Sequence, residues 1–402
     1  MFFKSNYIKK RSHIIYPLKI LYSMMQNHFS YWEKNSFFDY DAIIIGSGIV
    51  GLNAAIHLKK SASHLNIAIL ESGFLPSGAS TKNAGFACFG SISELIEQEN
   101  NSSSDKLYKL IEKRWKGLLK LRQLLGDKNL DYQCLGGYEL FKKDDIHLKE
   151  CCVSKIEHFN VMIKDIVGPN AFSLGNHKIK SFGFLGIDHL ISNQYEAQID
   201  TGKMMGSLIQ YAQSLGIKIF NSCSVQYIEQ SSQITLLTEQ GKFYCKKLVV
   251  TTNAFVKSWF PELDIMPGRG QVLITKPVKN LKVAGTFHYD RGYYYFRNIH
   301  HRILLGGGRN IDFKAEETTE FGETKCVQAA LEELLKKVIL PRQNFEIDLR
   351  WSGIMAFGKA LDPLITELAE NIFVATRCNG MGVAIGSQSG EDVAELLLQS
   401  GV

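Results

Sequence analysis

Three apolar segments near residue 40 have the pattern of a strand, a helix and a second strand. Tyr40–Ile45 is a short β-branched run, which predicts a buried strand. Ile49–Lys60 has apolar residues at helical spacing, and Asn66–Leu70 is a second strand-like run. The order of strand, glycine turn, helix and strand predicts a βαβ unit at the start of the globular part of the chain.

The middle of the chain predicts two amphipathic helices separated by short strands and turns. Lys106–Leu125 follows the capping residues of Asn100–Asp105 and stops at Gly126. Residues 131–190 show only short strands and turns. The next segment predicts a helix and four strands, at Thr201–Leu215, Ile217–Phe220, Ser224–Glu229, Ile234–Thr238 and Lys247–Thr252.

The last third of the chain predicts a second sheet, a charged helix, and a strand–turn–helix tail. The expected elements are strands at Gly270–Thr275, Tyr293–Arg297 and Ile303–Gly306, a helix at Glu316–Lys337, a strand at Ile372–Ala375 and a helix after Asn379–Gly386. No flexible linker interrupts the chain after residue 38. Two domains interleaved in sequence are therefore expected.

Charge is distributed unevenly. The whole chain has 46 basic and 40 acidic residues and a net charge of +6. Residues 1–38 hold six basic residues and one acid, so residues 39–402 carry 40 basic and 39 acidic residues. This near-neutral body weighs against nucleic acid as a partner, because phosphate binding needs a clustered cationic excess. Residues 1–38 are expected to be a poorly ordered basic extension, for which an over-extended start is weighed against a transit peptide.

The cysteine, histidine and hydropathy patterns exclude several site classes. The eight cysteines include no C-x-x-C pair, which predicts reduced thiols and a cytoplasmic protein. No metal-ligand spacing is found, so no metal is expected. The charge-free run Ala42–Leu58 has only 17 residues and contains the glycines of a turn, so no transmembrane helix is expected.

Gly46-Ser47-Gly48-Ile49-Val50-Gly51 is a G-x-G-x-x-G motif between the first strand and its helix. Gly46 permits the tight turn, Gly48 lets backbone approach a pyrophosphate, and Gly51 lets the helix pack on the strand. The unpaired N–H groups at the helix start favour phosphate. Glu71, twenty residues after Gly51, can accept hydrogen bonds from a ribose diol and repels a 2′-phosphate. FAD or NAD is therefore expected, and NADP is not.

A second glycine-rich turn distinguishes FAD from NAD. Asn379-Gly380-Met381-Gly382-Val383 lies more than 300 residues after the first motif and opens a helix. Glycines there would let backbone lie against a flat ring, and the helix N-terminus would stabilise a reduced anionic flavin. The alternative is an ordinary helix entry, but the density of glycines favours a flavin.

With these motifs the chain resembles the D-amino-acid-oxidase-like FAD-dependent oxidoreductase superfamily, which includes glycine oxidase, sarcosine oxidase and D-amino-acid dehydrogenase. The similarity runs from Asp39 to about Leu398 and includes Gly78-Ala79-Ser80-Thr81-Lys82-Asn83-Ala84-Gly85. The resemblance implies FAD contacts at Gly46, Gly48, Ile49, Val50, Gly51, Glu71, Ser72, Ser80, Thr81, Asn83, Gly85, Phe86, Val225, Thr252, Asn253, Gly353, Asn379, Gly380, Met381, Gly382 and Val383.

The sequence also departs from the superfamily pattern. Relatives typically carry a carboxylate-binding arginine just after the W-x-G strand, where this chain has Met355. The T-P-D-G-x-P-x-I-G run of relatives is shortened here to Leu361–Ile365. Relatives that bind flavin covalently use a cysteine in the W-x-G strand or a histidine near Asn83, and both are missing here. Non-covalent FAD is therefore expected.

The resemblance implies an α/β fold with a Rossmann-like FAD-binding domain and a substrate domain built on a mixed, mainly antiparallel sheet with helices. We assign residues 39–100, 191–265 and 345–402 to the FAD-binding domain. We assign residues 101–190 and 266–344 to the substrate domain.

The aromatic strand Tyr293–Arg297 supplies the first candidates for substrate binding. A strand period of two places Tyr293, Tyr295 and Arg297 on one face. An arginine beside two phenols can hold a carboxylate, although an aromatic strand with a surface arginine is an equal alternative. Arg309 follows three glycines, which let a ligand approach the backbone. Further cationic candidates are Arg269, His288 and Arg350.

The expected function is removal of hydride from the C–H next to nitrogen of a small amine or amino-acid-type substrate to flavin N5. Oxidation of a 2-hydroxy acid is the first alternative. An oxidase acting on a modified tRNA base and a non-catalytic flavoprotein are weaker alternatives. The sequence leaves open whether O2 or a respiratory quinone reoxidises the flavin.

Overall fold

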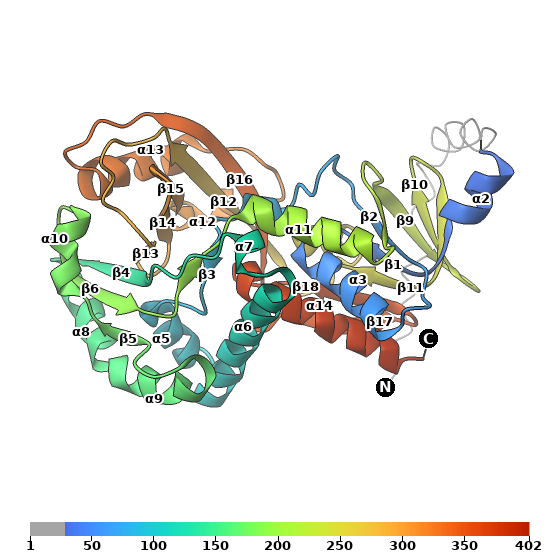
Figure 1. Ribbon diagram of the computed structural model, residues 1–402, viewed down its shortest axis with the longest axis horizontal. Helices are drawn as coiled ribbons and strands as arrows, with labels where there is room; N and C mark the ends of the chain where they lie inside the picture. The colour runs from blue at the N-terminus through green and yellow to red at the C-terminus, as the bar shows by residue number, and fades with distance from the viewer. Residues whose placement is uncertain (1–28, 402) are drawn as a thin grey trace.

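The computed structural model describes residues 29–401, which form two lobes, each built on an eight-stranded sheet (Figure 1). The predicted α/β class with one Rossmann-like and one mainly antiparallel sheet is confirmed. Among the described residues, no helix is both long and apolar enough to cross a membrane.

The first sheet has a parallel core whose strands come from distant parts of the sequence. β1 pairs in parallel with β11 on one side and with β2 on the other. Its strands, in spatial order, are β17 (Leu364–Ala369), β18 (Ile372–Thr376), β11 (Lys242–Val250), β1 (Asp39–Ile45), β2 (Ile67–Leu70) and β8 (Lys218–Phe220), and β10 (Ile234–Thr238) and β9 (Val225–Gln230) branch from β11.

The alternating side chains of this sheet build two apolar layers. Ala42 and Ile44 of β1 point toward helices α3 (Ile49–Ser61), α11 (Thr201–Ser214) and α14 (Gly382–Gln399). Ile43 and Ile45 point to the opposite layer, which is formed partly by β9 and β10. The parallel core strands therefore end at one edge, where the turns that follow β1, β2, β11 and β18 come together.

The second sheet is mainly antiparallel and carries the substrate-side candidates. Its strands, in spatial order, are β16 (Ile347–Phe357), β12 (Met266–Thr275), β15 (Arg302–Gly307), β14 (Tyr294–Ile299), β13 (Thr286–Tyr289), β4 (Gly137–Lys142), β6 (Ile187–Asn193) and β5 (Phe172–Leu174). A separate two-stranded ribbon joins β3 (Phe86–Ala87) to β7 (Ala197–Gln198).

The remaining helices cover the lobes and connect them. α6 (Ser104–Leu125) packs against α14 between the two sheets (Figure 1). The other helices are α2 (Tyr31–Phe37), α4 (Ala79–Lys82), α5 (Ile92–Asn100), α7 (Asp127–Leu130), α8 (Ile146–Ser154), α9 (Ile156–Val167), α10 (Ile179–Phe182), α12 (Phe313–Glu316) and α13 (Lys325–Leu334), with a π-helical extension at Leu335–Ile339 and 3₁₀ turns at Asn176–Lys178, Asn253–Ser258 and Arg309–Ile311.

Three sequence predictions about secondary structure were wrong. Residues 131–190 contain helices α8 and α9, whose buried residues Cys152, Phe159 and Ile163 pack into a cluster with α5 and α6. The helix expected at 316–337 forms only from Lys325, because residues 317–324 are not helical and Glu316 is instead the last residue of α12, with its carboxylate paired to Arg269. Residues 31–37 of the predicted disordered extension form helix α2, and the rest of that prediction falls mostly outside the described residues.

The proposed domain boundaries also differ from the sheet assignments in two places. β16 was placed with the FAD-binding domain, but it pairs along its length with β12 of the second sheet. Residues 191–193 complete β6 of the same sheet. Neither segment has a sequence pattern that reveals its partner, because pairing is decided by contacts with strands that are distant in sequence.

Candidate functional site

A cleft with a volume of about 850 Å³ lies between the two sheets, at the edge where the parallel strands of the first sheet end. Most of the predicted cofactor residues line this cleft, namely Gly46, Gly48, Ile49, Val50, Glu71, Ser72, Ser80, Asn83, Gly85, Phe86, Val225, Thr252, Asn253, Gly353, Asn379, Gly380, Met381, Gly382 and Val383. The substrate candidates Tyr293, Tyr295 and Arg309 also line it, whereas Gly51, Thr81 and Arg297 do not.

The first glycine turn brings the start of α3 to the cleft. Gly46 has φ +101°, a conformation that favours glycine. A Cβ on Gly51 would lie 2.0 Å from the Gly46 carbonyl oxygen, so Gly51 acts behind the turn by letting α3 pack closely. Gly48 precedes α3 and has no side chain to cap it. Gly48, Ile49 and Val50 line the cleft, so the positive N-terminal end of the helix faces it.

Glu71 is buried at the end of β2 and is held by donors from two turns. Its oxygens accept hydrogen bonds from the Ser47 N–H (2.9 Å), the Ser47 hydroxyl (2.7 Å) and the Gly73 N–H (2.9 Å). A carboxylate has about four acceptor positions, which leaves room for a further donor such as a ribose hydroxyl. Glu71 thus shapes the glycine turn and faces the cleft at the same time.

The segment of α4 forms a second wall through internal hydrogen bonds. Ser80 Oγ accepts from the Ile49 N–H (2.9 Å) and so links this segment to the start of α3. Asn83 Oδ1 accepts from the Gly85 N–H (2.8 Å), and Thr81 donates to the Pro76 carbonyl (2.6 Å). Thr81 therefore supports the turn from outside the cleft.

The second glycine turn presents the start of α14 to the cleft. Asn379 and Gly380 have φ values of +48° and +82°, and Asn379 Nδ2 donates to the Leu361 carbonyl (2.9 Å). A Cβ on Gly382 would meet no atom within 4 Å, so open space lies in front of this helix N-terminus. No side-chain cap is present at this end of α14.

Two buried hydroxyls in the cleft wall have no partner among the described residues. Thr252 Oγ1 and Thr376 Oγ1 are both inaccessible to water, and both residues line the cleft. Buried polar groups are normally hydrogen-bonded, so these two hydroxyls mark places where the described residues leave a hydrogen-bonding group of the cleft wall unsatisfied. Together with the glycine cradles and Glu71, they fit a dinucleotide such as FAD.

The substrate side of the cleft contains an arginine without an anionic partner. Arg309 lies over the rings of Phe313 and Phe357, at 5.1 Å and 4.2 Å from their centroids. No described residue makes a hydrogen bond or ion pair with its guanidinium. Burial lowers the pKa of Arg309, and burial raises the pKa of Tyr295 to about 12. The cleft therefore offers both a cation and a neutral phenol.

Only two of the three residues predicted to share one face of the strand do so, namely Tyr295 and Arg297. β14 begins at Tyr294, because residues 290–292 form a turn with positive φ at all three positions. Tyr293 reaches the cleft from that turn. Arg297 shares a sheet face with Tyr295, but Gly85 and Ile199 cover its end of the strand. Its position does not support the predicted direct contact with substrate.

Of the other cationic candidates, Arg269 and Arg350 are engaged elsewhere, whereas His288 is among the residues that line the cleft. Arg269 makes a two-point ion pair with buried Glu316, at 2.8 and 3.1 Å. Arg350 pairs with Glu332 away from the cleft. Sequence analysis missed Lys82 and the stacked rings of Phe255 and Phe321, which line the cleft. Lys82 lies within the Gly78–Gly85 motif and could have been predicted from it as a cleft residue. Phe321 lies in a segment that was predicted to be helical, so its sequence carried no such signal.

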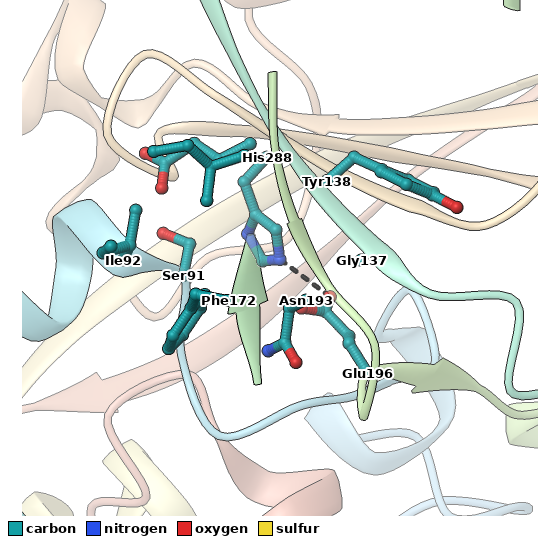
Figure 2. A pocket seen from close by; sticks show the side chains of 10 residues that line it. Ser91, Ile92, Gly137, Tyr138, Phe172, Asn193, Glu196 and His288 are labelled. Carbon is teal, nitrogen blue, oxygen red and sulfur yellow. Dashed lines mark hydrogen bonds and ion pairs between the residues drawn. The ribbon is translucent and has the colours of Figure 1, made fainter. Parts of the chain in front are cut away.

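His288 forms part of a buried polar cluster beside a small cavity (Figure 2). His288 Nε2 lies 2.8 Å from Glu196, and its other ring nitrogen lies 3.9 Å from Glu94. Burial alone would lower the pKa of His288, but Glu196 and Glu94 raise it to about 9. Cys88, Glu196 and His288 have ligand atoms within 4.8 Å of one another, but we assign this group to an ion pair and not to a metal site.

Comparison with known proteins identifies the family to which this chain belongs. Residues 41–396 match the family described as FAD dependent oxidoreductase. The glycine oxidase of Bacillus subtilis is 22% identical over 376 residues, covering 90% of this chain and 94% of the relative. The gamma-glutamylputrescine oxidoreductase of Escherichia coli is 22% identical over 372 residues, covering 89% and 83%.

Solved structures of other proteins share the fold of this chain. A glycine oxidase from Geobacillus kaustophilus aligns with a TM-score of 0.71 and 19% identity, over 90% of this chain and 95% of that chain. An L-proline dehydrogenase from P. horikoshii gives the same TM-score with 18% identity, over 90% and 94%. The chain belongs to the FAD-dependent oxidoreductase family, and FAD is its cofactor.

Proposed function

We propose that this family member oxidises the carbon–nitrogen bond of an amine or amino-acid-type substrate that carries an anionic group. When bound, FAD accepts the hydride at N5 and supplies the redox chemistry. Relatives named as glycine oxidase and gamma-glutamylputrescine oxidoreductase support a nitrogen-containing substrate. The observation that carries the proposal is the unpaired guanidinium of Arg309 in the cleft.

Arg309 is proposed to bind the anionic group and so orient the substrate. The rings of Phe313 and Phe357 hold the guanidinium without using its N–H donors, which stay available for two parallel hydrogen bonds to a carboxylate. The arginine that relatives carry near the position of Met355 is missing, so Arg309 supplies this charge from a different element. Tyr295 is proposed to donate a hydrogen bond to the substrate as a neutral phenol.

A 2-hydroxy acid remains the second candidate substrate, because Arg309 would bind its carboxylate in the same way. The two candidates differ in the bond that loses hydride. Purified FAD-loaded protein should be mixed anaerobically with panels of amines, amino acids, N-substituted amino acids and 2-hydroxy acids. Bleaching of the flavin band by nitrogen-containing members alone is expected, and bleaching by hydroxy acids alone would exclude the proposal. Reoxidation of the bleached protein by O2 or by a quinone then identifies the acceptor.

The role of Arg309 is tested with the best substrate from these panels. Loss of one partner from a hydrogen-bonded charge pair costs about 2–5 kcal/mol, so Arg309→Gln should raise the half-saturating concentration at least about 30-fold. Arg342→Gln removes an exposed arginine outside the cleft and is the matched control. Equal affinity of both variants for a carboxylate substrate would show that Arg309 does not bind the anion.

A further inference from the structure

Arg297 on β14 is a buried arginine that lacks a partner. Only 6% of the residue is exposed, and its Nε has no acceptor. No hydrogen bond or ion pair joins its guanidinium to any described residue. The other buried arginines differ in this respect, because Arg114 donates to the Phe89 carbonyl, Arg269 pairs with Glu316 and Arg377 pairs with Asp264.

The two carboxylates that act electrostatically on Arg297 already interact with other groups. Asp200 caps α11 by accepting from the Lys203 N–H (2.9 Å), and Asp131 lies 3.5 Å from Lys203 Nζ. Burial lowers the pKa of Arg297 to about 10, while these two carboxylates act weakly in the opposite direction. Arg297 therefore stays a cation at neutral pH. An unpaired buried charge opposes folding, so its presence calls for a functional reason.

The guanidinium of Arg297 lies directly behind the cleft wall. Its Nη2 is 3.0 Å from the position that a Cβ on Gly85 would occupy, and the Ile199 carbonyl oxygen is 2.4 Å from that position. Gly85 has φ +72° and lines the cleft. Gly85, which lines the cleft, therefore lies against the guanidinium, and its missing side chain leaves room for the charge to approach this part of the cleft wall.

We propose that Arg297 is a positioning residue that acts across Gly85 to stabilise the negative charge of the reduced flavin. Hydride transfer to neutral flavin adds two electrons and one proton and leaves one net negative charge. A unit cation in an effective dielectric of about 20 changes such an equilibrium more than tenfold out to about 10 Å. The proposal rests on FAD binding alone and holds whichever substrate is oxidised.

Sulfite binding to the FAD-loaded protein tests this charge without substrate turnover. The sulfur lone pair of sulfite forms a new N–S bond to flavin N5, which leaves one negative charge on the ring and one on the bound sulfonate. Arg297→Met, which keeps side-chain length but removes the cation, should weaken sulfite binding at least about tenfold. The two-electron reduction potential of the flavin should fall in parallel, by about 30 mV for each tenfold. Arg297→Lys should keep most of the sulfite affinity.

Thermal stability separates the proposed role from a structural one. Because Arg297→Met removes an unpaired buried charge, its melting temperature should equal or exceed that of the wild type. Arg302→Met, on the neighbouring strand and away from the cleft, controls for the change in net charge. A sulfite affinity within twofold of the Arg302→Met value would overturn the proposal. Equal losses in Arg297→Met and Arg297→Lys would also overturn it, since charge would then not be the cause. If Arg297→Met fails to fold, Arg297→Gln replaces it under the same criteria.

Discussion

Because α3 packs closely on the first glycine turn, replacing Gly51 by alanine should destabilise the protein, whereas the same change at an open position in another helix should stabilise it. In Gly51→Ala the new Cβ would lie 2.0 Å from the Gly46 carbonyl oxygen and 2.6 Å from Thr251 Oγ1. The nearer obstacle is backbone, so α3 must move away from the turn. Overpacking of this kind costs about 1–3 kcal/mol, and the short backbone contact favours a cost of about 3 kcal/mol.

Gly206→Ala provides the matched control in α11. Gly206 is exposed in the middle of that helix, and a Cβ there would meet no atom within 4 Å. Alanine in a helix interior is better than glycine by about 0.5–1 kcal/mol, so this substitution should stabilise the protein. The two variants make the same chemical change, and only the surroundings of the new methyl group differ.

Chemical unfolding and FAD titration of both variants measure the difference. Gly51→Ala should lower the free energy of unfolding and weaken FAD binding, because the phosphate-binding end of α3 is displaced. Gly206→Ala should raise the free energy of unfolding and leave FAD affinity unchanged. If Gly51→Ala is as stable as Gly206→Ala and binds FAD like the wild type, the close helix–turn contact and the reasoning built on it are wrong.

Two further predictions concern charged groups. Glu71→Gln should weaken FAD binding about tenfold in fluorescence titration, since the amide NH2 would face the Gly73 N–H or a Ser47 donor and a ribose hydroxyl would lose a charged acceptor; unchanged affinity would contradict this role. The pKa of His288 is raised to about 9, so its contribution to stability is full below about pH 6.5 and is lost as pH rises through 9. The free energy of unfolding should therefore fall over this range more steeply in the wild type than in His288→Asn, and parallel pH profiles would contradict the assigned ion pair.

The secondary-structure predictions that the structure confirms were local in sequence. The βαβ unit formed as expected within one or two residues, and Gly46, Gly48 and Glu71 line one cleft. Each depends on interactions among neighbouring residues, such as a turn that requires positive φ or a helix N-terminus that follows a strand. The second glycine turn was also recognisable, because its backbone conformation is set by Asn379 and Gly380 themselves.

The predictions that failed depended on distant partners. Glu316 is buried in an ion pair with Arg269, 47 residues away, within a segment whose sequence predicted one continuous helix. β16 joins the second sheet by pairing with β12, which lies about 80 residues earlier in the chain, and the composition of β16 does not reveal this partner. A one-residue shift in the start of β14 moved Tyr293 into a turn.

The sequence alone determined the class of fold, the dinucleotide fingerprint and the family resemblance, because glycine conformation, strand alternation and helix capping act over a few residues. Only the tertiary structure decided which arginine faces the cleft. Tyr295 and Arg297 share a strand face, but Gly85 and Ile199 cover the arginine and leave the tyrosine open. Arg309 instead reaches the cleft from the turn after β15. Periodicity assigns a side chain to a face, but the segments that pack on this face decide whether the side chain contacts a ligand or lies behind the wall.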